Sequence, residues 1–364
     1  MTDMLIQPVS APARLVSEAP YRLEDLDAYL TCTEIVDVTH DVKSFGFALP
    51  GPAVLHFLPG QFLTFRLRVD GERVERCYTI SSAPTRPERL TITVKRVPGG
   101  VVSNWLHDHL RVGDAIGASG PNGSFSSAIH PANKYLFLTA GSGITPAMSM
   151  LRTLRDTADP AGIVFVHCAR TPDDIIFDDE LETLAGERGV TVCIVCESDS
   201  LSQRWDGPRG RLTLQALLQA APDLIDREIF TCGPPPYMDA VRELLDWVGV
   251  DPARSHEESF VIGGGTSIDE LDGATTATTY QVDLRRSGQL VACDSSTTIL
   301  DAAARAGVTL PSSCGEGMCG SCKLIMLSGQ VDMQHAGGIR PREIAQDKIL
   351  PCCSKPLDDL VLDA

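Results

Sequence analysis

The chain has 364 residues, of which 43% are hydrophobic and 22% charged, and its formal net charge is −17 at pH 7. That length exceeds one ordinary hydrophobic core and predicts two or three domains. The acidic balance argues against nucleic acid and anionic membrane as partners. It suits a partner protein with a basic docking face, although a solvated acidic surface is the commoner cause of such a charge. No apolar run is long enough to span a bilayer.

The amino-terminal sequence and the cysteine content point to a reducing compartment. Residues 1–8 contain an acidic residue and no sustained apolar core, so we expect no secretory signal. Twelve cysteines without an export signal favour the cytoplasm, where thiols serve metals and catalysis. Residues 1–27 carry prolines, mixed charge and little periodicity, and we interpret them as a leader.

From residue 28 to about residue 130 the chain consists of short β-rich stretches separated by Gly and Pro turns. Their alternating pattern predicts strands at 31–38, 44–49, 62–69, 77–81, 90–97 and 115–118. A short helix is expected to begin at Ser103. Short strands of this kind are typical of a small antiparallel β-barrel, which we expect over residues 28–130.

Strands and helices alternate over residues 131–260. Residues 135–139 form a continuous apolar run, which is typical of a strand buried on both faces, and a glycine-rich turn and an amphipathic helix follow. Further strands are predicted at 162–168, 190–196, 228–232 and 255–260, and further helices at 177–184, 212–220 and 237–248. This alternation predicts a doubly wound α/β domain with a parallel sheet.

The last part of the chain follows a predicted linker. Residues 261–278 are rich in Gly, Thr, Ala and Asp, a composition typical of flexible connections. A hairpin is then predicted at 280–284 and 289–293, and a helix at 297–306 that Gly307 ends. We therefore expect a third domain over residues 279–364.

Four cysteines of this third domain have the spacing of a metal site: Cys314, Cys319, Cys322 and Cys352. The pattern C-x4-C-x2-C…C is the one by which plant-type ferredoxins hold a [2Fe–2S] cluster through four thiolates. Structural zinc usually takes two short cysteine or histidine pairs, and disulfides need an oxidising compartment, so both alternatives fit less well. Cys353 fits the spacing less well than Cys352. Cys193 and Cys196 also have redox-motif spacing, but they fall inside a predicted buried strand and are interpreted as core.

Four further segments occur in a characteristic order along the chain: Arg76-Cys-Tyr-Thr-Ile-Ser-Ser82, Gly99-Gly-Val-Val-Ser103, Gly141-Ser-Gly-Ile-Thr-Pro146 and Cys232-Gly-Pro-Pro-Pro236. With them, residues 28–260 resemble the ferredoxin–NADP reductase superfamily, and residues 279–364 resemble a plant-type ferredoxin. The resemblance implies an antiparallel β-barrel flavin domain, an α/β doubly wound nicotinamide domain and a β-grasp [2Fe–2S] ferredoxin domain. The leader and the Cys-Cys-Ser ending are similar to reductase components of Rieske-type monooxygenases that act on glycine betaine and related quaternary amines.

The resemblance implies a flavin site on the barrel. Arg76 would bind the flavin phosphate, Tyr78 would lie against the isoalloxazine ring, and Thr79 would place its hydroxyl near flavin N5. Glycine and serine at a helix start suit a pyrophosphate, because backbone N–H groups point toward it. The implied flavin-binding residues are Arg76, Tyr78, Thr79, Ser82, Gly100, Val101 and Ser103. FAD suits the Gly-Gly-x-x-Ser segment better than FMN, although FMN also fits.

The resemblance also implies a nicotinamide site at the carboxyl edge of the parallel sheet. The implied binding residues are Gly141, Gly143, Thr145, Cys232, Gly233 and Pro234. Cys232 would face the nicotinamide, and Phe260, with Glu258 as the weaker candidate, would cover the flavin, so the catalytic group is Tyr78, Thr79, Cys232 and Phe260. Arg170 would meet an adenosine 2′-phosphate or a ribose edge; the family favours NADH, with NADPH left open.

These resemblances imply a reductase that passes electrons from NAD(P)H through flavin and a [2Fe–2S] cluster to a separate acceptor protein. The expected acceptor is the oxygenase component of a Rieske-type demethylase or monooxygenase. Hybrid-cluster protein and a di-iron oxygenase remain as other acceptors, and oxygen or a quinone as a small-molecule acceptor. A redox-sensing [2Fe–2S] binding protein is the alternative from another class.

Overall fold

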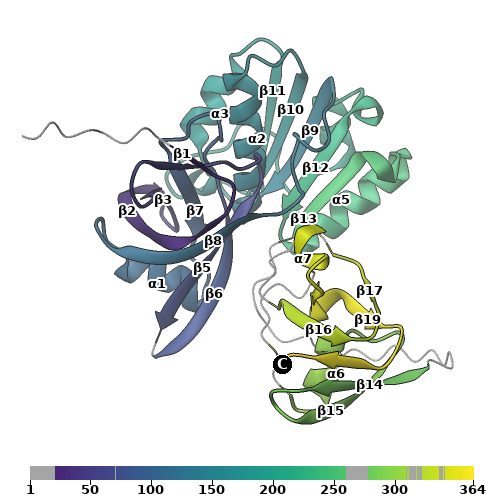
Figure 1. Cartoon of the computed structure of the whole chain (residues 1–364). Coiled ribbons are helices and arrows are strands. Elements are labelled where there is room, and N and C mark those ends of the chain that lie inside the picture. The colour runs from purple at the N-terminus through teal and green to yellow at the C-terminus, as the bar shows by residue number, and fades with distance from the viewer. Residues whose placement is uncertain are drawn as a thin grey trace, which may run out of the picture.

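The computed structural model describes residues 21–69, 71–259, 278–308, 310, 317, 322–335, 339 and 341–364. Residues 1–20 of the predicted leader, Phe260, and residues 261–277 of the predicted linker lie outside these residues. The described residues form an antiparallel sheet, a parallel α/β sheet and a smaller mixed sheet in chain order (Figure 1). Among them, no helix is long and apolar enough to cross a membrane.

The first unit is a six-stranded antiparallel sheet with the strand order β6-β5-β8-β2-β3-β7. Its strands are β2 (Leu26–Thr39), β3 (Val42–Ala48), β5 (Phe62–Val69), β6 (Glu72–Thr79), β7 (Leu90–Lys95) and β8 (Ala115–Asn122). Two short strands, β1 (Tyr21–Leu23) and β4 (Ala53–Leu55), pair with each other. Phe45, Phe65 and Leu30 are fully buried between the strands, and helix α1 (Val101–His109) covers this core. The helix begins two residues before the expected Ser103, because Gly100 takes the extended conformation of the residue that precedes a helix.

The second unit is a five-stranded parallel sheet with the strand order β11-β10-β9-β12-β13. Its strands are β9 (Lys134–Ala140), β10 (Gly162–Ala169), β11 (Val190–Cys196), β12 (Glu228–Gly233) and β13 (Ser255–Ser259). The helices are α2 (Ile144–Asp156), α3 (Asp178–Ala185), α4 (Leu214–Ala220) and α5 (Pro235–Val248), with single 3₁₀ turns η1 (Gly141–Gly143), η2 (Pro172–Asp174), η3 (Leu224–Asp226) and η4 (Pro252–Arg254). Separate cores join α2 and α3 to one face and α4 and α5 to the other, so the sheet is doubly wound as predicted.

Polar contacts join the first two units through helix α2. The Arg152 guanidinium donates to the Ser81 carbonyl at 2.5 Å, and the Ser149 hydroxyl donates to the Ser82 carbonyl at 2.7 Å. At the end of the helix, the Asp156 carboxylate accepts two hydrogen bonds from the Arg86 guanidinium, at 2.8 and 2.6 Å. The segment that follows β6 is therefore held directly against the helix that follows β9.

The third unit is a mixed sheet with the strand order β15-β14-β20-β16-β18. Its strands are β14 (Thr279–Leu284), β15 (Gln289–Asp294), β16 (Leu324–Ser328), β18 (Lys348–Ile349) and β20 (Leu360–Leu362), and a separate pair joins β17 (Val331–Met333) to β19 (Ser354–Pro356). Helix α6 (Ile299–Arg305) packs on the sheet, and the short α7 (Pro341–Ile344) and η5 (Pro351–Cys353) lie between strands. A sheet with one helix packed on it is the arrangement expected of a β-grasp domain.

Candidate functional site

The predicted flavin segment lies at the end of β6, antiparallel to β5. Tyr78 pairs with Leu63 and Thr79 with Phe62, so the two residues point to opposite faces of the strand. The Tyr78 ring is half-buried and contacts the edge of Phe65, with ring centroids 6.0 Å apart. Burial raises the pKa of the Tyr78 phenol well above its ordinary value, which outweighs the opposing charge of Arg76. The phenol is therefore neutral throughout the physiological range.

Thr79 presents a hydroxyl without a partner. The residue is 4% exposed, and its Oγ1 is buried with no hydrogen-bond partner among the described residues. Buried polar atoms without partners are rare in native structures, and each calls for an explanation such as a bound water, an ion or a functional role. Ser82, three residues further on, already accepts a hydrogen bond from the Thr91 backbone N–H at 3.1 Å.

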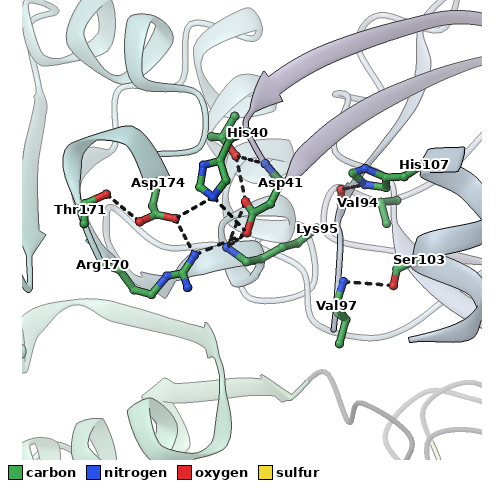
Figure 2. A network of polar contacts seen from close by, with 11 residues as sticks. His40, Asp41, Val94, Lys95, Val97, Ser103, His107, Arg170, Thr171 and Asp174 are labelled. Atoms are coloured by element: carbon green, nitrogen blue, oxygen red, sulfur yellow. Dashed lines mark hydrogen bonds and ion pairs between the residues drawn. The ribbon is translucent and has the colours of Figure 1, made fainter. Parts of the chain in front are cut away.

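The predicted pyrophosphate segment forms the start of α1. The Ser103 hydroxyl accepts from the Val97 backbone N–H at 3.2 Å, as Figure 2 shows, and the Asn104 side chain donates to the carbonyls of Val97 and Gly100. The Ser103 hydroxyl is thus engaged in the preceding turn. Gly100 provides no side-chain cap, so the first backbone N–H groups of the helix have no capping side chain among the described residues. Those N–H groups are suited to an anion.

The glycine-rich turn after β9 meets the end of β12. Gly141 has a φ of +51°, and a Cβ on Gly143 would lie 2.2 Å from the Cys232 carbonyl oxygen. Only glycine fits at position 143, because any side chain would collide with backbone there. The Thr145 hydroxyl donates to the Ser142 carbonyl at 3.1 Å, within the same turn. At the end of β12, Pro234 is the residue that precedes helix α5. The two predicted nicotinamide segments are therefore direct neighbours.

Cys232 and Glu258 lie side by side on β12 and β13, where they are register partners. Cys232 is 1% exposed and Glu258 4% exposed. Burial, and to a smaller degree the nearby Glu258, raises the pKa of the Cys232 thiol, so the sulfur is neutral. Burial also raises the pKa of Glu258 to about 8, and its Oε2 has no hydrogen-bond partner among the described residues.

Two of the predicted cluster cysteines lie together in the third unit. The sulfur atoms of Cys322 and Cys352 are 3.2 Å apart, and the Gly317 backbone N–H donates to the Cys352 sulfur at 3.2 Å. Two thiolates on one tetrahedral metal, each at about 2.3 Å, lie a little under 4 Å apart, so this pair is close to the spacing of two ligands on one iron. Cys353 contacts the Leu350 carbonyl at 3.6 Å instead. Cys314 and Cys319 lie outside the described residues.

A polar network joins the barrel to the end of β10 (Figure 2). The Arg170 guanidinium donates to Asp174 at 2.7 Å and to Asp41 of the barrel at 3.5 Å. Lys95 of the barrel pairs with Asp41 at 3.0 Å, and the Thr171 hydroxyl donates to Asp174 at 2.7 Å. Arg170, which the sequence singled out, is therefore already flanked by two carboxylates.

Comparison with known proteins gives these sites a common context. Family models match an oxidoreductase FAD-binding domain over residues 29–127, an oxidoreductase NAD-binding domain over 137–243 and a 2Fe-2S iron–sulfur cluster binding domain over 282–357. The glycine betaine monooxygenase reductase subunit of Pseudomonas aeruginosa is 43% identical and is aligned over 91% of this chain and 94% of its own. The chain belongs to this family of iron–sulfur flavoprotein reductases.

A second relative and a solved structure are similar to the chain over nearly its full length. The stachydrine N-demethylase reductase subunit of Rhizobium meliloti is 40% identical and is aligned over 92% of this chain and 96% of its own. The solved structure of phthalate dioxygenase reductase, described as modular for electron transfer from pyridine nucleotides to [2Fe–2S], is 26% identical, with a TM-score of 0.57. It covers 93% of this chain and 98% of its own. The protein is therefore an oxidoreductase with FAD-binding, NAD-binding and [2Fe–2S]-binding domains in one chain.

The residues present fit the three groups that this reductase family carries. The unpartnered Thr79 hydroxyl lies where a polar atom of FAD is expected, and the uncapped start of α1 suits its pyrophosphate. Gly143 packs on the Cys232 carbonyl and has no side chain, so a dinucleotide could approach the backbone of this turn closely. The sulfur pair of Cys322 and Cys352 suits iron, with the Gly317 N–H donating to one sulfur.

One predicted residue lies outside the described residues, and the sequence analysis missed several residues near the sites. Phe260 lies outside the described residues, so its predicted place over the flavin stays a prediction. Glu258 was ranked below Phe260, yet it is the buried carboxyl beside Cys232. Asp41, Lys95 and Asp174 were not singled out at all. Their positions depend on contact between two domains, for which the sequence contains no short-range signal.

Proposed function

We propose that this reductase transfers electrons from NADH to the oxygenase component of a Rieske-type monooxygenase that demethylates glycine betaine or a related quaternary amine, in the cytoplasm. The alignment with the glycine betaine monooxygenase reductase subunit over nearly the full length of both chains carries the choice of partner. The stachydrine N-demethylase reductase subunit supports the same substrate class, because stachydrine is also a quaternary amine. The proposed domains are those expected from the sequence: 28–130, 131–260 and 279–364, with a leader at 1–27 and a linker at 261–278.

The proposed roles of the chain's own residues follow from their environments. Arg76, Ser82 and the start of α1, with Gly100, Val101 and Ser103, would bind FAD, which accepts electrons as a pair and releases them singly. Tyr78 offers a neutral aromatic face, and Thr79 an unpaired hydroxyl. The nicotinamide of NADH would be positioned by the residues at the meeting point of β9 and β12: Gly141, Gly143, Thr145, Cys232, Gly233 and Pro234.

The buried pair at this meeting point would control the environment of the reacting atoms. The Cys232 thiol is neutral, so it would add no charge beside a bound nicotinamide. Glu258 can hold a proton on its carboxyl near neutral pH, because burial raises its pKa to about 8. We assign the outlet for electrons to Cys314, Cys319, Cys322 and Cys352.

The proposal is tested by reconstitution with purified oxygenase components and counting of product. With the oxygenase component for glycine betaine, NADH oxidation should produce formaldehyde in proportion to the methyl group removed. With oxygenase components for steroid or aromatic substrates, NADH oxidation should stay at the background rate. Equal coupling to all of them, or coupling only to a non-amine oxygenase, would contradict the proposed substrate class.

The outlet is tested with a matched pair of cysteine variants. Cys352→Ser should lose the cluster iron and cytochrome c reduction, yet keep NADH-dependent ferricyanide reduction at the flavin. Cys353→Ser should keep all three, because the sulfur of Cys352 is the one that lies beside Cys322. Cytochrome c reduction that survives in Cys352→Ser would show that the electrons leave by another route.

A further inference from the structure

A cluster of nitrogen and oxygen ligands lies away from the three sites of the reductase. It consists of His130, in the segment between the barrel and β9, Glu228 at the start of β12, and His256 on β13. One ligand atom from each residue lies within 4.8 Å of the other two. The Glu228 carboxylate is 2.6 Å from His256 Nε2, and the two imidazole rings stack with centroids 3.7 Å apart.

This cluster is distinct from the nicotinamide site. Glu228 begins β12, whereas Cys232 lies near the carboxyl end of the same strand. Four residues of a strand span roughly 13 Å, so the two groups lie at opposite ends of it. The cluster also differs from the network at Arg170, in which two cations already occupy the space around the carboxylates.

The three ligand residues are half-buried. The side chains of Glu228 and His256 are 14% and 15% exposed, and Phe230 packs against His256 with ring centroids 4.9 Å apart. Phe230 also contacts His130, at 6.2 Å. Phe230 therefore contacts both imidazoles, and each of the three ligand residues keeps part of its surface exposed.

We propose that His130, Glu228 and His256 form a binding site for a divalent transition metal of the zinc type, with a fourth position open to water. Two imidazoles and one carboxylate are a ligand set that Zn²⁺ uses when one position is left free. Mg²⁺ and Ca²⁺ prefer sets made of oxygen alone, so they should not compete. Ligands about 2.1 Å from a tetrahedral ion lie roughly 3.4 Å from one another. The Glu228–His256 pair, now at 2.6 Å, would open by less than 1 Å, and the two stacked imidazoles would turn so that one ring nitrogen of each points at the ion.

The site would join three segments that are distant in the sequence. His130 lies between the barrel and β9. Glu228 and His256 lie on β12 and β13, the last two strands of the sheet on one side of β9. A metal bound by all three fixes the segment between the domains to β12 and β13. Because such a metal binds only the folded chain, it should raise the thermal midpoint of the reductase.

Arg254 opposes metal binding. Its Nε lies 3.6 Å from Glu228 Oε2, on the oxygen that does not contact His256, and it supplies positive charge next to the ligands. Removal of that charge should therefore strengthen binding. Arg254→Gln is expected to bind Zn²⁺ several-fold more tightly than the wild-type chain, since two nearby cations repel each other.

The test uses untagged, FAD- and iron-loaded protein equilibrated with buffered Zn²⁺, with zinc, iron and FAD counted after gel filtration. The wild-type chain should retain one zinc per FAD with no loss of iron, and Mg²⁺ should not displace it. His130→Phe and His256→Phe keep an aromatic ring for the stack but remove a ligand. Each should weaken binding by more than the roughly 10–100-fold that loss of an outer partner costs.

The matched control is His56→Phe. His56 pairs with Glu24 at 2.9 Å on the surface, as His256 pairs with Glu228, but among the described residues it belongs to no group of three ligand side chains. This variant should retain the zinc. Zinc that is absent from the wild-type chain, is bound equally by all four proteins, or replaces iron would overturn the proposal.

X-ray absorption of the zinc-loaded wild-type protein gives a readout that needs no variant. The expected spectrum shows nitrogen and oxygen neighbours near 2.0–2.2 Å, with the multiple-scattering signature of two imidazoles. Sulfur neighbours near 2.3 Å would mean that the zinc has entered the cluster cysteines, and would overturn the proposal.

Discussion

At the scale of single residues, Glu258 is a fully buried carboxyl with a strongly raised pKa. Its side chain is buried beside Cys232, and burial raises its pKa from 4.5 to about 8. In the unfolded chain the same carboxyl loses its proton at ordinary acidic pH. The folded chain therefore holds one proton more than the unfolded chain between about pH 5 and pH 8. Its free energy of unfolding falls by about 1.4 kcal/mol for each pH unit across that window.

Replacement of this carboxyl should remove the pH dependence. Glu258→Gln is expected to be as stable as the wild-type chain near pH 4.5 and increasingly more stable as the pH rises toward 8. Denaturant unfolding of the FAD-loaded proteins at pH 5.5, 6.5 and 7.5, followed by tryptophan fluorescence, measures the difference.

The neighbouring Glu257→Gln is the control, because Glu257 is exposed and paired with Arg242 at 2.6 Å. A constant stability difference between Glu258→Gln and wild type across this pH range would show that the carboxyl is ionised in the folded chain.

At the scale of secondary-structure elements, the turn between β2 and β3 meets the end of β10. Asp41 in this turn and Asp174 in η2 both face the Arg170 guanidinium (Figure 2). Burial alone would raise the pKa of Asp174, but hydrogen bonds from Thr171 and Arg170 outweigh it and lower the pKa. Asp174 therefore remains charged beside Arg170, and Asp41 lies 3.5 Å from the same guanidinium, which is the group that could attract a 2′-phosphate. A phosphate at this position would be repelled by both.

Neutralising these carboxylates should weaken the proposed preference for NADH. Asp174→Asn and Asp41→Asn are each expected to raise kcat/KM for NADPH about tenfold relative to that for NADH, since one like charge at short range near a surface is worth about 1–4 kcal/mol. Ferricyanide reduction with each nucleotide measures the ratio.

Asp37→Asn serves as the control, because Asp37 lies in the same region, is 79% exposed and pairs with Lys43. An unchanged nucleotide ratio in both test variants would mean that these carboxylates do not face the bound nucleotide.

The elements differ in how well their sequences predict them. The bounds predicted for β5 and β11 are confirmed, because apolar runs between turn residues define a buried strand in the sequence itself. Strands β1 and β4 were missed: each has three residues, too few to show a period. Cys196 lies buried in the core on β11, and Cys193 on the same strand is half-buried against it; burial is the main cause of the raised pKa of each thiol.

The residues of the candidate site also differ in how well the sequence predicts them. Residues that share a short motif, such as Tyr78 and Thr79, can be selected from the sequence because the motif places them together. Pairs formed across the fold cannot: Glu258 meets Cys232 only because β13 is added beside β12. Likewise Asp41 meets Arg170 only because the barrel and the parallel sheet are in contact.

At the scale of the whole molecule, Arg152 holds the FAD-binding and NAD-binding domains together. Its side chain is 13% exposed and donates to the Ser81 carbonyl and to both carboxylate oxygens of Glu180. It also lies over the Phe177 ring, 4.6 Å from the centroid. Ser81 lies two residues after Thr79, so this contact helps to hold the segment with Tyr78 and Thr79 at a set distance from helix α2.

Loss of this contact should affect both stability and the rate of flavin reduction. Arg152→Ala leaves the Ser81 carbonyl and Glu180 unpaired, at a cost of about 2 kcal/mol or a fall of about 4–8 °C in the thermal midpoint. Because a displacement of about 1 Å can cost a hundredfold in rate, NADH should reduce the flavin at least about tenfold more slowly in stopped-flow measurements.

Arg155→Ala removes an arginine one turn further along α2 that pairs with Glu187 inside the NAD-binding domain. It should leave the rate of flavin reduction unchanged. Equal rates in Arg152→Ala and the wild-type chain would show that the domains keep their spacing without this side chain.

The acceptors in this contact have a consequence for how the reductase can change over generations. On the barrel side, Arg152 and Ser149 bind the main-chain carbonyls of Ser81 and Ser82, which every amino acid possesses. Mutations that alter the barrel side chains at these two positions therefore leave the acceptors in place. The two domains can therefore keep these two hydrogen bonds while the side chains at positions 81 and 82 change during evolution.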